Sequence, residues 1–96
     1  KYKKLILVLG VSSDKDKPGI CSQFSRLADE VILTKADNPR ATDPQNLAAY
    51  FSRKNTHITM SVKEAKCLAR GLAEKEDLVL VTGSLFVVGE FRDDKK

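Results

Sequence analysis

The sequence predicts an α/β fold in which a mostly parallel sheet carries helices on both faces. Short apolar runs at residues 5–9, 31–33 and 77–81 each end in a polar turn. Between these runs lie stretches with helical periodicity, so successive strands are too far apart along the chain for hairpins. Strands joined through helices pair in parallel, with right-handed crossovers. The 96 residues suggest a single domain.

The first half of the chain is expected to form a strand, a helix and a second strand. Residues 5–9 are a continuous apolar run, which is typical of a strand buried on both faces. After the polar loop at residues 11–17, Pro18 suits the first turn of a helix. The N–H that proline lacks would have no partner within the helix at that position. Four apolar side chains then share one helical face: Ile20, Phe24, Leu27 and Ala28. Residues 31–33 form the second strand.

The second half continues this alternation with a helix and a short strand. Asp43 is expected to cap a second helix, with Pro44 at its first position. The apolar side of that helix comprises Leu47, Ala48, Tyr50 and Phe51. Residues 56–60 alternate weakly between polar and apolar and predict a short third strand.

A capping box opens the third helix. Ser61 is expected to bond the backbone of Glu64, whose side chain reaches back. The apolar side of this helix comprises Val62, Ala65, Leu68, Ala69, Leu72 and Ala73. Residues 77–81 form the fourth strand, and residues 85–91 form a short closing helix. The complete order predicts a Rossmann-like sheet of about four to five strands.

Composition limits the classes of function. The net charge of +4 and the pI of about 9.2 are weak indications of an anionic partner. Five of the 17 basic residues lie in the terminal runs, so the sequence does not predict a basic stripe for nucleic acid. No signal peptide or apolar run of about 18 residues is present, and we expect a cytoplasmic protein without a membrane partner. Cys21 and Cys67 are expected to be free thiols, with Cys67 packed within its helix.

Three loops leave the carboxyl ends of predicted strands, and ligands bind at that edge of an α/β sheet. They are residues 10–17, 34–40 and 82–84. The first loop has the spacing of neither a P-loop nor a dinucleotide fingerprint. The helix that follows it offers free N–H groups to an anion, assisted by Lys15, but a solvated charged turn fits equally well.

The second loop contains Asp37-Asn38-Pro39-Arg40. Asp37 offers a carboxylate for an ammonium group, and Arg40 offers a guanidinium that matches a carboxylate in a bidentate way. An amino acid carries both groups, so the loop is a candidate for amino-acid recognition. The alternative is a plain turn, because Asp and Asn before Pro are common turn formers and Asn38 can bond its own backbone.

The remaining polar candidates have structural explanations of their own. Gly83 permits close approach of a ligand, but Ser84 is more simply read as the cap of the following helix. Glu90 is expected to be a solvated carboxylate. His57 has no acid-base partner nearby in the sequence, so catalysis by it is not expected.

The segments at these loops resemble the C-terminal domain of folylpolyglutamate synthase/dihydrofolate synthase, within the Mur ligase family. The matching segments are residues 9–11, 14–16, 28–34, 37–41, 43–44 and 80–90, in the family's order over nearly the whole chain. The last segment is the most specific. The Asp37–Arg40 segment also resembles the loop with which the peptidoglycan-building branch holds its incoming amino acid.

The resemblance implies an ATP-dependent amide ligase. ATP would phosphorylate a carboxylate of the folate or dihydropteroate substrate, and the amine of L-glutamate would attack the acyl phosphate. The P-loop and the Mg²⁺ ligands of such enzymes lie in an earlier central domain, which would be the partner of this one. By the same resemblance Asp37, Asn38 and Arg40 would face glutamate, and Asp14, Lys15 and Ser84 would line the same edge.

The chain also departs from the family pattern. It has no P-loop, and it lacks the Asp-x-Ala-His-Asn-Pro segment with which the family's C-terminal domain begins. Residues 1–96 are therefore expected to be a fragment of that domain without its first strand, inactive in isolation, with an exposed sheet edge that favours self-association. Two alternatives remain at this point: a stand-alone α/β module for a small anion or nucleotide, and an oligomerisation domain.

Overall fold

The computed structural model describes residues 2–13, 15–51, 55–83 and 85–92. It contains one sheet of four parallel strands in the order β3-β2-β1-β4. The strands are β1 (Leu5–Leu9), β2 (Glu30–Leu33), β3 (Asn55–Ile58) and β4 (Leu78–Thr82). The helices are α1 (Lys17–Ser25), the 3₁₀ helix η1 (Pro44–Phe51), α2 (Val62–Leu72) and α3 (Leu85–Arg92). The predicted α/β class, the parallel pairing and the order of elements are confirmed.

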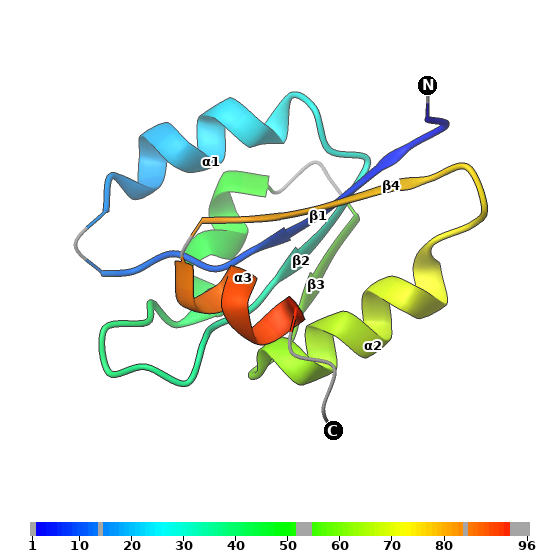
Figure 1. The fold of residues 1–96 in the computed structure, drawn as a ribbon. Coiled ribbons are helices and arrows are strands. Elements are labelled where there is room, and N and C mark those ends of the chain that lie inside the picture. Colours follow the sequence, from blue (N-terminus) through cyan, green and yellow to red (C-terminus); the bar gives the residue numbers. More distant parts are fainter. Residues whose placement is uncertain (1, 14, 52–54, 84, 93–96) are drawn as a thin grey trace.

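Helices cover both faces of the sheet, with α1 and η1 on one side and α2 and α3 on the other (Figure 1). The central strand β1 is buried along its whole length, so its alternate side chains enter two different cores. Leu5, Leu7 and Leu9 pack with α1 and η1, whereas Ile6 and Val8 pack with α2 and α3. This double burial explains why residues 5–9 read as a continuous apolar run rather than an alternating one.

Two glycines let the strand exits come close together. Gly83 has a φ of 106°, in the region that favours glycine. A Cβ at Gly83 would also collide with the carbonyl oxygen of Gly10. A Cβ at Gly10 would lie 2.6 Å from Cγ2 of Val87 in α3. The exits of β1 and β4 and the start of α3 therefore meet at one place, where only small residues fit.

Some predicted details are wrong. Because α1 ends at Ser25, Leu27 lies beyond the helix and is 55% exposed, and Cys21 fills the inner face instead. Cys67 is exposed rather than packed, because it lies about 200° around α2 from the buried Ala65. The second predicted helix is 3₁₀ rather than α: the Asp43 carbonyl accepts the Asn46 N–H at 2.9 Å, an i→i+3 bond.

The capping predictions at Ser61 and Asp43 hold, with one change of partner, and the cap predicted at Ser84 lies outside the described residues. Ser61 Oγ accepts the Glu64 N–H at 3.1 Å, as expected for an N-cap. The Glu64 side chain reaches back to the N–H of Met60, not of Ser61. At η1, Asp43 Oδ1 accepts the Gln45 N–H at 3.0 Å.

β4 lies at one edge of the described sheet. Among the described residues it pairs on one side only, with β1, and Leu78 is 44% exposed. An unpaired strand edge is a template for another strand. Self-association through this edge stays a prediction. None of the helices in the described part of the chain is long and apolar enough to cross a membrane.

Candidate functional site

The loops that follow β1 and β2 are joined by an antiparallel bridge between Ser12 and Ala41. The N–H of Ser13 donates to the carbonyl of Arg40 at 2.7 Å, and the N–H of Thr42 donates to the carbonyl of Val11 at 2.9 Å. The expected convergence of the first two exit loops is therefore confirmed. The bridge also holds the backbone of Arg40 beside the first loop.

Asn38 organises the second loop from within. Its side-chain Oδ1 accepts the Arg40 N–H at 2.8 Å, and its carbonyl accepts the Ala41 N–H at 3.0 Å. Its own N–H donates to the carbonyl of Ala36 at 2.8 Å. The turn-forming alternative therefore accounts for the Asn38 oxygen. The amide nitrogen of that side chain is a donor that a ligand could use.

An open hollow lies beside this loop. Its volume is about 520 Å³, and small-molecule sites commonly measure about 300–1,000 Å³. The loop after β2, the amino end of α2 and the helix α3 supply its lining: Lys35, Ala36, Asp37, Asn38, Pro39, Met60, Ser61 and Glu90. One cation and two carboxylates thus surround a space that can take a small charged molecule.

Glu90 is the residue that sequence reasoning missed. Glu90 is exposed, as expected of a solvated carboxylate, but its Oε2 also accepts the backbone N–H of Asp37 at 3.0 Å. The two residues are 53 positions apart and belong to different elements. Local patterns report neighbours three or four residues away. No such pattern could have found this contact.

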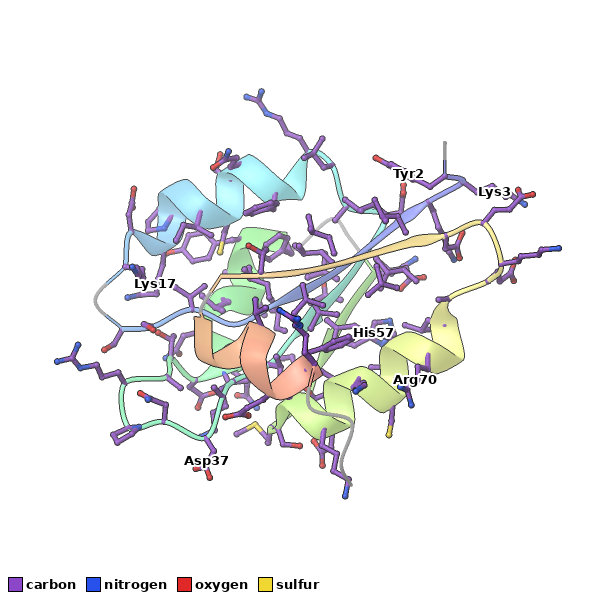
Figure 2. All side chains as sticks on the ribbon, viewed as in Figure 1. Tyr2, Lys3, Lys17, Asp37, His57 and Arg70 are labelled. Atoms are coloured by element: carbon purple, nitrogen blue, oxygen red, sulfur yellow. The ribbon has the colours of Figure 1, made fainter. Side chains whose placement is uncertain are left out.

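The predicted site residues do not all gather in the hollow. Asp37 and Asn38 line it, and Figure 2 shows the Asp37 side chain at the outer tip of the loop, directed away from the sheet. Arg40 is exposed in the same loop but does not line the hollow. Lys15 is exposed in the first loop, where its N–H donates to the carbonyl of Ser12 at 3.1 Å. Asp14 and Ser84 lie outside the described residues.

His57 has an acidic partner that is distant in the sequence. Its Nε2 lies 3.0 Å from Oε1 of Glu30. The other carboxylate oxygen of Glu30, Oε2, lies 3.9 Å from the ammonium nitrogen of Lys4. Glu30 opens β2, so this cluster sits toward the amino end of the sheet. It is distant in the topology from the exit loops and forms no part of the candidate site.

Comparison with known proteins identifies the domain. The family model described as the Mur ligase glutamate ligase domain matches residues 1–85. That match covers most of the chain. The chain belongs to the Mur ligase glutamate ligase domain family.

Relatives of this Mur ligase domain come from two branches. A probable bifunctional folylpolyglutamate synthase/dihydropteroate synthase of Haloferax volcanii is 38% identical over 94 residues, which cover 95% of the chain and 11% of the relative. The UDP-N-acetylmuramoyl-L-alanyl-D-glutamate–2,6-diaminopimelate ligase of Nitrosomonas europaea is 38% identical over 87 residues, or 83% of the chain and 16% of the relative.

A solved structure agrees with the fold. The bifunctional folylpolyglutamate synthase/dihydrofolate synthase with Mn, AMPPNP and L-glutamate bound superposes with a TM-score of 0.82 at 29% identity. The superposition covers 91% of the chain and 21% of the solved one. The chain therefore spans about a tenth to a fifth of the proteins it matches.

Proposed function

We propose that this Mur ligase domain is the amino-acid-presenting part of an ATP-dependent amide ligase that adds L-glutamate to a folate or dihydropteroate. The reaction would pass through an acyl phosphate, and the chain would be inactive in isolation. Family membership supports the ligase class. The observation that carries the choice of role is the loop after β2, whose charged residues stand at the strand exits beside a hollow.

Within this proposal the loop recognises both ends of the amino acid. The Arg40 guanidinium binds a glutamate carboxylate, the Asp37 carboxylate faces the ammonium group, and the Asn38 amide nitrogen donates to an oxygen. Asp14, Lys15 and Ser84 complete the same edge. A relative solved with L-glutamate bound supports the choice of amino acid.

The activating machinery is assigned to the rest of the enzyme. ATP and Mg²⁺ would be held mainly by a central P-loop domain, which would be the partner of this one in the cytoplasm. Among the residues the structure describes, no three His, Cys, Asp or Glu side chains gather as a metal site. ATP bound in the central domain would supply the phosphoryl group that activates the carboxylate, and Mg²⁺ would neutralise charge on the phosphates.

Arg40→Ala in the full-length protein tests the assigned role. A hydrogen bond to a charged group contributes about 1.5–3 kcal/mol, so the glutamate KM should rise roughly 10- to 100-fold. The ATP KM should stay within about twofold, because this loop does not hold the nucleotide. Arg26→Ala, which removes an exposed arginine beyond α1, should leave both values unchanged. An unchanged glutamate KM in Arg40→Ala would remove Arg40 from the substrate site.

A further inference from the structure

The loop after β2, residues 34–40, is called here the recognition loop, and it depends on a side chain from the last helix, α3. Among the described residues, the hydrogen bond from the Asp37 N–H to Glu90 Oε2 is the one that ties residues 35–39 to another element. The other bonds of this stretch stay within the loop and involve Asn38. Pro39 has no N–H to donate. The tip of the loop is therefore anchored to the rest of the fold at Asp37.

Packing places Glu90 where it can hold this anchor. Val87 is 1% exposed and forms a small core with Ala36 and Val62. Glu90 lies three residues after Val87, on the same face of α3, and Asp37 directly follows Ala36. The apolar contact thus sets the distance between α3 and the loop, and the hydrogen bond sets the orientation of the peptide at Asp37.

The anchor also lies in the hollow itself. Glu90, Asp37 and Asn38 all line it, and Arg40 follows the anchored peptide by three residues. No hydrogen bond among the described residues uses the second oxygen of Glu90, Oε1, so a neutral amide can replace the carboxylate at this contact.

We propose that Glu90 is a positioning residue for amino-acid recognition. It holds the Asp37 peptide, and through it the loop as far as Arg40, in the conformation that binds the incoming amino acid. This inference rests on the proposed function. The positioning role requires an acceptor oxygen on the side chain at position 90, but it does not require a negative charge there.

Two substitutions separate these requirements in the full-length protein. Glu90→Ala removes the acceptor and should raise the glutamate KM about tenfold while the ATP KM stays within about twofold. Glu90→Gln keeps an acceptor oxygen and should restore the glutamate KM to within about threefold of the parent value. Asp77→Ala is the matched control: it also removes a carboxylate that accepts a backbone N–H, from Glu74 at 2.9 Å, but at the start of β4. It should leave the glutamate KM unchanged.

Amide hydrogen exchange at Asp37 gives a readout that needs no ligase activity. The Asp37 amide should exchange about tenfold faster in Glu90→Ala than in the parent or in Glu90→Gln. A glutamate KM that is unchanged in Glu90→Ala, or raised equally in Glu90→Gln, would overturn the positioning role. Should the parent protein ligate no glutamate, the proposed function falls by itself. If the Asp37 amide then also exchanged at the same rate in all three proteins, Glu90 would not hold the Asp37 peptide.

Discussion

Asn38 shows how one side chain of the loop after β2 can shape a turn and still offer a donor. Its Oδ1 accepts the Arg40 N–H, which shapes the turn, and its amide nitrogen remains a donor. The sequence allowed both a turn and a site at this position. The Asn38 oxygen takes part in the turn, and we propose that the amide nitrogen donates to glutamate.

The two cysteines differ in their exposure to solvent. Burial raises the pKa of the Cys21 thiol from 9.0 to about 11, whereas Cys67 is exposed on α2. Since the thiolate is the reactive species, Cys21 stays protonated at pH values where an ordinary thiol ionises. At a pH of about 9, iodoacetamide should therefore modify Cys67 at least about tenfold faster than Cys21.

Mass spectrometry of the labelled chain measures this difference. In Cys67→Ser the fast labelling should vanish, and unfolding in urea should expose Cys21 to the reagent. Equal labelling of both cysteines in the native chain would contradict the burial of Cys21.

Periodicity located the elements, but their ends depended on contacts that it does not contain. The four strands lie within two residues of the predicted runs. The runs of β1 and β2 were apolar because these strands are buried, whereas β3 is half-exposed and its run only alternated weakly. Leu27 continued the apolar pattern of α1, yet the helix ends at Ser25 and leaves it exposed. Helix boundaries are set by capping and by the next strand, here β2, rather than by apolar spacing.

One glycine in the turn after β4 and one in α2 lead to opposite predictions. Gly83→Ala places a Cβ at a φ of 106° and against the Gly10 carbonyl, so it should destabilise the fold by about 2 kcal/mol or more. Gly71 lies in α2, and a Cβ added there would meet nothing within 4 Å, so Gly71→Ala should stabilise the fold by roughly 0.5–1 kcal/mol.

Urea unfolding compares these two variants with the parent chain. Both variants replace glycine by alanine, so each is the control for the other. A loss of stability below about 0.5 kcal/mol in Gly83→Ala would contradict the close packing of the strand exits.

On the scale of the whole molecule, we assign amino-acid recognition to the loop after β2 and the activation of the carboxylate to the rest of the enzyme. The fold and the convergence of the first two exit loops followed from strand-helix alternation, because parallel strands bring their exits to one edge. The anchor at Glu90 did not follow, because it joins residues 53 positions apart through tertiary packing. The chain spans about a tenth to a fifth of the relatives it matches, so we place the remaining chemistry outside it.

Ligation by the full-length protein tests this division of labour most directly. Supplied with ATP, Mg²⁺, labelled L-glutamate and dihydropteroate or a folate, it should form labelled amide and ADP in equal amounts. The isolated 96-residue chain should form neither. Absence of ATP-dependent glutamate ligation by the full-length protein, or a preference for diaminopimelate over glutamate, would contradict the account.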